Sequence, residues 1–122
     1  MLAEPVVVRR GDGVTKGMRY GRGSVQMLVG PADGAVQLDM HINLILPGSA
    51  PGPRHFHSTS ENAFFVIAGE GSVVIGDDEY LVSAGDFLFI PPGVTHSVSN
   101  AGASLLQVLE IYSPAAVDFV EV

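Results

Sequence analysis

The chain has 122 residues and no cysteine, and 47% of its residues are hydrophobic. This length predicts a single domain, residues 1–122, with a modest hydrophobic core. The formal net charge is −7 and the six Lys and Arg residues form no basic cluster, so we expect no nucleic-acid partner. The absence of cysteine excludes a disulfide framework and thiolate metal ligands, so any metal must be bound by imidazole, carboxylate, amide or water.

The N-terminal segment has neither a targeting nor a membrane signature. Its basic pair, Arg9-Arg10, follows a short apolar run rather than preceding it, which is not the layout of a signal peptide. No uninterrupted apolar stretch of the sequence is long enough to span a bilayer. We therefore expect a cytoplasmic protein that has no membrane partner.

Short segments rich in Val, Ile, Leu, Phe and Tyr are separated by fifteen glycines and eight prolines, a pattern typical of strands joined by tight turns. No segment has a 3.6-residue apolar period, so we expect almost no helix. The predicted strands are, in chain order, Pro5–Arg9, Ser24–Val29, Ala35–Leu46, Arg54–His57, Asn62–Ala68, Ser72–Ile75, Glu79–Val82, Asp86–Ile90, Thr95–Ser99 and Ser104–Ile111. An all-β chain of this length predicts a sandwich or a small barrel.

The third predicted strand alternates cleanly between apolar and polar residues, so its two faces differ in character. The apolar face contains Val36, Leu38, Met40, Ile42 and Leu44. The polar face contains Gln37, Asp39, His41 and Asn43. The polar face would either contact solvent or line a polar pocket, and both interpretations stay open.

Three histidines have the spacing of a metal site. His55 and His57 lie at alternate positions of an extended segment, so their side chains point to the same side. His96, which follows a Pro-Pro-Gly turn further along the chain, can supply a third imidazole nitrogen. Three such nitrogens suffice to hold one metal ion and leave a coordination position open.

A longer motif surrounds His96. The segment from Gly85 to Asn100 contains Gly, Pro, Gly, His and Asn at the spacings of the second conserved motif of the cupin family. In these positions the chain resembles the cupins, whose domains are conserved β-barrels. The resemblance covers about residues 35–112 and implies an all-β cupin-type barrel, or double-stranded jelly roll.

The first cupin motif is present with one departure. His55-Phe-His57 and Gly69 match the motif, but the residue at the family's acidic ligand position is Asn62, with Glu61 one residue earlier. The resemblance implies that His55, His57 and His96 are metal ligands. We favour Asn62 at the fourth position, and the alternative is Glu61 if a β-bulge absorbs the extra residue.

His41 is a further candidate. In germin-like cupins, a polar residue that faces the metal pocket lies six residues before the proline that corresponds to Pro47, and His41 has this place here. The resemblance makes His41 a fourth ligand or a catalytic acid or base beside the metal, with a pKa suited to neutral pH. Gln107, Glu110 and Tyr112 lie on a late strand that reaches the cavity in cupins, and their facing is unresolved.

The proposed chemistry follows from the ligand set. Three neutral imidazoles leave the charge of a divalent ion uncompensated, which lowers the pKa of bound water and polarises carbonyl groups. An apolar cavity is expected from aromatic residues placed in the core or cavity wall: Phe64, Phe65, Phe87 and Phe89.

We therefore predict an enzyme that uses one divalent transition metal (zinc, iron, manganese or nickel) on a small, apolar, carbonyl-bearing substrate. Its Lewis-acid chemistry would be of the polyketide cyclase, isomerase or lyase type. Two alternatives stay open: an iron- or other transition-metal-dependent dioxygenase, and a non-catalytic small-molecule binding or sensing protein. By analogy with cupins, and because exposed strand edges benefit from pairing, we expect a homodimer.

Overall fold

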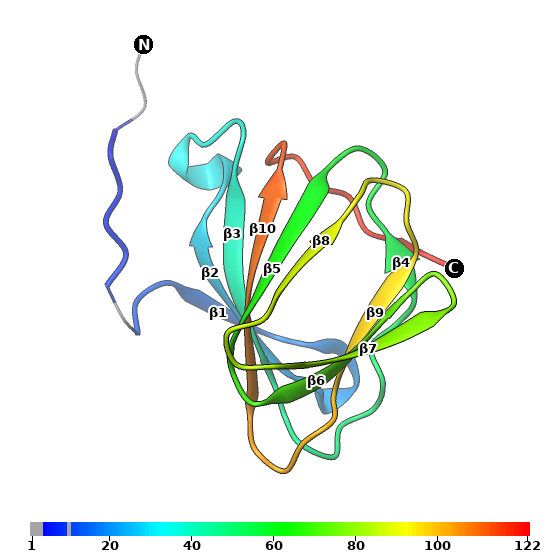
Figure 1. Ribbon diagram of the computed structural model, residues 1–122. Coiled ribbons are helices and arrows are strands. Elements are labelled where there is room, and N and C mark those ends of the chain that lie inside the picture. The colour runs from blue at the N-terminus through cyan, green and yellow to red at the C-terminus, as the bar shows by residue number, and fades with distance from the viewer. Residues whose placement is uncertain (1–3, 10) are drawn as a thin grey trace.

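The computed structural model describes residues 4–9 and 11–122. Its strands are β1 (Val14–Gly17), β2 (Gly23–Val29), β3 (Asp39–Ile45), β4 (His55–Phe56), β5 (Glu61–Ala68), β6 (Glu70–Ile75), β7 (Asp78–Ser83), β8 (Phe87–Ile90), β9 (His96–Asn100), β10 (Leu106–Ser113) and β11 (Val120–Glu121). They form two antiparallel sheets that pack face to face (Figure 1). The strand order is β1-β2-β3-β10-β5-β8 in the six-stranded sheet and β11-β4-β9-β6-β7 in the five-stranded sheet.

Helix is nearly absent from this part of the chain, as predicted. Two short 3₁₀ helices, η1 (Arg19–Gly21) and η2 (Pro31–Asp33), are the only helical elements among residues 4–9 and 11–122. No helix of the described residues is long and apolar enough to cross a membrane. The prediction of an all-β jelly-roll barrel is confirmed.

The hydrophobic core fills one end of the barrel interior. Both sheets contribute to it, with Ile45, Phe64, Val66, Val73, Val82, Val98, Leu106 and Val108. Side chains of a strand alternate between its two faces, so on β10 the buried residues are Leu106, Val108, Glu110 and Tyr112. The first two belong to the core, whereas Glu110 and Tyr112 belong to a polar region. The interior is therefore apolar at one end and polar at the other, where the candidate site lies.

The predicted strand Pro5–Arg9 is wrong. This segment pairs with no described strand, and Figure 1 shows it extending away from the barrel. Its valines have high strand propensity, but propensity does not form a strand without a partner, and Pro5 lacks a backbone donor. Arg10, the second residue of the N-terminal basic pair, lies outside the described residues. The other predicted strands are present, with shifted ends.

Three further differences concern the presence or the bounds of strands. β1 and β11 were not predicted, because both are short and lack a clear alternation; backbone pairing with β2 and β4 holds them in place. β3 begins at Asp39 rather than at the predicted Ala35, because the chain bends at residues 36–37 directly after η2. The polar residues of β3 are nevertheless on the predicted common face.

The placement of Phe87 and Phe89 in the core is wrong, and neither lines the cavity beside the histidines, although Phe87 lines a second hollow with Phe65. The side chains of Phe87 and Phe89 are 77% and 58% exposed, because β8 turns Leu88 and Ile90 inward instead. A strand that is apolar at every position carries no sign of which face is buried. Phe65 packs against Phe87, with ring centroids 4.6 Å apart, and Phe64 is the member of the set that belongs to the core.

Candidate metal centre

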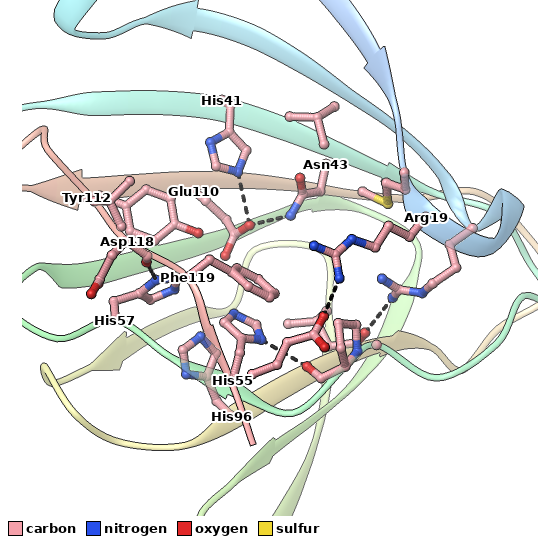
Figure 2. Close-up of a pocket in the computed structure, with 18 of the residues that line it drawn as sticks. Arg19, His41, Asn43, His55, His57, His96, Glu110, Tyr112, Asp118 and Phe119 are labelled. Atoms are coloured by element: carbon pink, nitrogen blue, oxygen red, sulfur yellow. Dashed lines mark hydrogen bonds and ion pairs between the residues drawn. The ribbon is translucent and has the colours of Figure 1, made fainter.

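Strands β4 and β9 bring the three predicted histidines together. His55 opens β4 and pairs with His96, the first residue of β9, while His57 follows β4 directly. One ring nitrogen from each histidine lies within 4.8 Å of those of the other two. Figure 2 shows the three rings grouped together. The convergence predicted from the spacing of these histidines is therefore observed.

The backbone fixes the orientation and tautomer of each imidazole. The Nδ1 atoms of His55 and His96 lie 2.9 Å from the carbonyl oxygens of Pro53 and Val94, and that of His57 lies 2.6 Å from the carbonyl oxygen of Asp118. Since a carbonyl only accepts hydrogen bonds, each Nδ1 carries the proton and each Nε2 keeps a free lone pair. Metal-binding histidines are commonly oriented in this way.

Two of these free nitrogens are buried without a partner. His57 and His96 are 4% and 2% exposed, and neither Nε2 atom has a hydrogen-bond partner among the described residues. Buried polar atoms are normally satisfied, so an unpartnered pair that points toward a third imidazole requires explanation. A divalent ion bound by three Nε2 atoms would satisfy them, and the residues therefore fit a metal.

Burial also keeps two of the three imidazoles, those of His55 and His96, neutral. Desolvation lowers the pKa of His55 to about 4, and the nearby His96 and His57 reinforce the shift by charge repulsion. Desolvation likewise lowers the pKa of His96. Both side chains are therefore unprotonated at neutral pH, the state in which imidazole binds metal.

The lowered pKa of His55 predicts acid sensitivity of the metal-free protein. As the pH falls from 6.5 toward 4, the unfolded chain binds a proton at His55 and the folded chain does not, so the free energy of unfolding decreases. Urea denaturation of the metal-free protein at several pH values measures this slope. The matched variant His55→Asn is expected to have a shallower slope, and equal slopes for the two proteins would contradict the prediction.

The two candidates for the fourth cupin position, Asn62 and Glu61, differ in burial. Asn62 is fully buried on the inner face of β5, while the side chain of Glu61 is on the exposed face of the strand. The register shift between β5 and β10 lies near Ala68 and does not turn Glu61 inward. Asn62 donates from Nδ2 to the carbonyl oxygens of Ala63 and Ile111, and its Oδ1 has no partner among the described residues. Asn62 thus supplies a third unpartnered buried atom.

A cavity of about 420 Å³ adjoins the histidines. Its apolar wall includes Val25, Met27, Val98, Val117 and Phe119. Phe119 stacks on His55, with ring centroids 3.9 Å apart, and so covers one side of the histidine cluster (Figure 2). A cavity of this size, with both apolar and polar residues on its wall, is suited to a small molecule.

The C-terminal residues hold this cover in place. Asp118 accepts hydrogen bonds from the backbone N–H and hydroxyl of Ser58, and β11 pairs with β4. Glu121 forms an ion pair with Arg19 at 2.6 Å. The segment 117–122 is therefore attached at several points around the histidine cluster.

A second group of polar residues faces the cavity from β3 and β10. His41 Nε2 lies 3.2 Å from Glu110 Oε2, and His41 Nδ1 lies 3.6 Å from Asp39 Oδ1. Asn43 donates a further hydrogen bond to Glu110. The polar face of β3 thus lines a pocket, which decides between the two interpretations of its alternation. Tyr112 stacks on His41 and also packs edge-on against His57, so it lies between the two groups.

The carboxylates set the charge of His41. Burial alone would lower the pKa of His41, but the hydrogen bond and charge of Glu110, together with the charge of Asp39, raise it above 6.5. His41 in turn lowers the pKa of Glu110 against the effect of burial. Burial and Glu110 raise the pKa of Tyr112, so its phenol stays protonated. The protonated form of His41 is therefore favoured, with Nε2 facing Glu110 and Nδ1 facing Asp39.

The fold and these residues define a jelly-roll barrel with a candidate metal centre beside a small-molecule cavity. The family profile described as "Cupin domain" matches residues 42–112, more than half of the chain. The chain belongs to the cupin family, which confirms the resemblance seen in its two motifs.

Curated relatives match parts of longer proteins. An uncharacterized protein of Methanocaldococcus jannaschii is 31% identical over 65 residues, which are 53% of this chain and 52% of that protein. Mannose-1-phosphate guanylyltransferase of Klebsiella pneumoniae is 35% identical over 69 residues, which are 57% of this chain and 14% of that enzyme. The chain thus spans about half of the first relative and a small part of the second.

Solved structures show the same fold. The polyketide cyclase RemF of Streptomyces resistomycificus superimposes with a TM-score of 0.83 and 22% identity, covering 98% of this chain and 86% of RemF. Oxalate decarboxylase of Lactobacillus farciminis superimposes with a TM-score of 0.77 and 22% identity, covering 88% of this chain and 33% of that enzyme. Oxalate decarboxylase of Bacillus subtilis, described with Mn(II) centres, superimposes with a TM-score of 0.77 and 19% identity, covering 88% of this chain and 30% of that enzyme.

Proposed function

We propose that the protein is a metal-dependent enzyme that acts on a small, mainly apolar, carbonyl-bearing substrate. In this proposal His55, His57 and His96 hold one divalent transition metal: zinc, iron, manganese or nickel. The proposal is carried by one observation, the convergence of three oriented Nε2 atoms, two of them buried and unpartnered, beside a cavity of about 420 Å³. The metal supplies Lewis acidity that polarises a carbonyl oxygen.

The other residues of the cavity would position the substrate and move a proton. His41, whose protonated form the charges of Asp39 and Glu110 favour, would supply a proton, passed through its hydrogen-bond partner Glu110, to an oxygen that gains negative charge during the reaction. Phe119 and the apolar wall would exclude water, which strengthens these electrostatic interactions. A cyclisation, isomerisation or lyase step requires these elements and no further reactant. The similarity in fold to the polyketide cyclase RemF supports this version.

Elemental analysis of the purified protein tests the proposal. Stoichiometric zinc is expected if the reaction uses Lewis-acid chemistry. Stoichiometric iron would instead favour a dioxygenase, since imidazole ligands alone suit several metals. Failure to retain any divalent metal after careful loading would overturn both, and would leave a non-catalytic binding or sensing protein whose ligand affinity does not depend on metal.

We also propose that Asn62 contributes its Oδ1 atom to the metal centre. Asn62→Ala is expected to lower the affinity for the loaded metal about tenfold, as changes around a metal site commonly do. Glu61→Ala is the matched control, because the adjacent side chain is exposed on the other face of β5. Competition with a chromophoric chelator measures both affinities. Equal affinities for the two variants would remove Asn62 from the site.

We further propose that the chain forms a single domain, that the protein is located in the cytoplasm and that it forms a homodimer. The outward-facing Phe65, Phe87 and Phe89 support the dimer, since they place apolar surface where a second copy would bury it. Its proposed partner otherwise is the small-molecule substrate.

A further inference from the structure

We propose that Arg22 forms an anion-binding subsite in the cavity, so that the substrate carries a carboxylate or a comparable acidic group besides the carbonyl directed to the histidines. This inference rests on the proposed function and specifies its substrate class. Arg22 lies between η1 and β2 and lines the same cavity as the three histidines. It is a charged side chain that is only 8% exposed.

The guanidinium is firmly held but not neutralised. Its Nε atom donates to the carbonyl oxygen of Ala50 at 2.9 Å, and its Nη2 atom donates to that of Val98 at 2.8 Å. Both acceptors are uncharged, and no carboxylate of the described residues forms an ion pair with Arg22. The Nη1 atom has no hydrogen-bond partner in the described part of the chain, so its two N–H donors are available to a ligand.

The carboxylates around the cavity are already engaged elsewhere. Asp39 and Glu110 lie against His41, Asp118 accepts from Ser58, and Glu121 pairs with Arg19. A buried charge without a counter-charge is costly, so buried arginines are normally paired. An anionic ligand is therefore the missing partner of this guanidinium. Arginine is also suited to a carboxylate, because its planar donors match the two oxygens.

Neighbouring backbone segments pack closely against Arg22. A side chain at Gly52 would place its Cβ atom 3.0 Å from Arg22 Nη2 and 2.3 Å from the carbonyl oxygen of Val98. The loop before β4 can therefore pass beneath the guanidinium because residue 52 is glycine. The backbone of Arg22 is fixed as well, since its carbonyl oxygen accepts from the N–H of Leu46.

The distance to the histidines fits one small molecule. Val98, which anchors Arg22 Nη2, is two residues after His96 on β9 and thus on the same face of the sheet. Two residues of a strand span about 7 Å. A substrate with a carbonyl group at one end and an acidic group at the other, separated by a short apolar part, could contact the histidines and Arg22 at the same time. Met18 and Val98 line the cavity near this path.

Titration with sodium benzoate tests the subsite, with benzamide as the uncharged probe of similar shape. In the intact, metal-loaded protein labelled with ¹⁵N-arginine, benzoate is expected to shift the Arg22 Nε–H resonance saturably, and benzamide is not. Arg22→Gln is expected to weaken benzoate binding about tenfold or more. The control Arg9→Gln, which removes an exposed arginine outside the cavity, is expected to bind benzoate as the unchanged protein does.

The metal-free protein separates this inference from the proposed function. If benzoate still shifts the Arg22 resonance without metal, the anion is bound at Arg22. If benzoate binding persists in Arg22→Gln but disappears with the metal, the anion binds the metal, and the inference is overturned while the proposed function stands. If Arg22→Gln does not fold, the resonance in the unchanged protein decides: no shift, or an equal shift with benzamide, overturns the inference. Failure to bind metal overturns the proposed function alone.

Discussion

Replacing His57 with alanine is expected to abolish stoichiometric metal binding while leaving the barrel folded. Loss of an outer hydrogen-bond partner of a metal ligand already costs about 10–100-fold in affinity, so loss of one of three imidazoles should cost at least about 100-fold. The fold should survive because the hydrophobic core, which includes Phe64 and Leu106, lies at the other end of the barrel interior. Elemental analysis and thermal unfolding, measured on the same preparation, report the two effects separately.

The control for this variant is His41→Gln. Both ring nitrogens of His41 face carboxylates, with Glu110 at 3.2 Å and Asp39 at 3.6 Å, so neither is available as a ligand. His41→Gln should therefore keep its metal. Full metal occupancy in His57→Ala would refute the ligand assignment, and loss of metal in His41→Gln would make His41 a fourth ligand instead of an acid.

One side effect of His57→Ala must be distinguished from metal loss. His57 Nδ1 also donates to the carbonyl oxygen of Asp118, so the variant loses one attachment of the segment 117–122. The two hydrogen bonds between Ser58 and Asp118, and the ion pair between Arg19 and Glu121, do not involve His57. The variant His57→Asn keeps a polar side chain at this position, and it should lose metal to a similar extent if the imidazole is the ligand.

The convergence of the histidines was predictable because local geometry determines it. Alternate residues of an extended segment share a face, which places His55 and His57 together, and the motif around His96 fixes the turn that presents it. The same rule correctly grouped Asp39 with His41. In each case the relevant residues are a few positions apart, so the backbone conformation alone relates their side chains.

Residues that act through long-range contacts were harder to predict. The sequence left open whether Glu110 and Tyr112 or Gln107 point into the barrel, because β10 has polar residues on both faces. Arg22 and Phe119 belong to no motif, and they reach the cavity through contacts with distant segments. No local pattern in the sequence encodes such contacts, and an irregular segment has no periodicity from which its facing can be derived.

The chemical character of the cavity depends on both kinds of residue. His55 and His96 are neutral imidazoles, and the Nε2 atoms of His57 and His96 have no partner among the described residues. Arg22 provides a fixed positive charge, and Glu110 favours the protonated form of His41. Each of these states is set by neighbours rather than by residue type, since burial lowers the pKa of His55 whereas carboxylates raise that of His41. Histidines in one cavity can therefore serve as metal ligands and as an acid.

Replacing Glu110 with glutamine is expected to lower the pKa of His41. Burial lowers this pKa, and the largest influences that raise it are the hydrogen bond and charge of Glu110. Glutamine keeps the size of the side chain but removes the charge, so only Asp39 then opposes the effect of burial. NMR titration of the His41 ring protons in the metal-free protein measures the pKa without the charge of a metal ion.

The variant Asp39→Asn provides the comparison. Asp39 lies 3.6 Å from His41 Nδ1, whereas Glu110 lies 3.2 Å from Nε2, so neutralising Asp39 should lower the pKa of His41 by a smaller amount. If the pKa of His41 is unchanged in Glu110→Gln, the carboxylate does not raise it, and the role of Glu110 reduces to its hydrogen bonds with His41 and Asn43. A decrease larger than that in Asp39→Asn would instead identify Glu110 as the residue that chiefly favours the protonated form of the proposed acid.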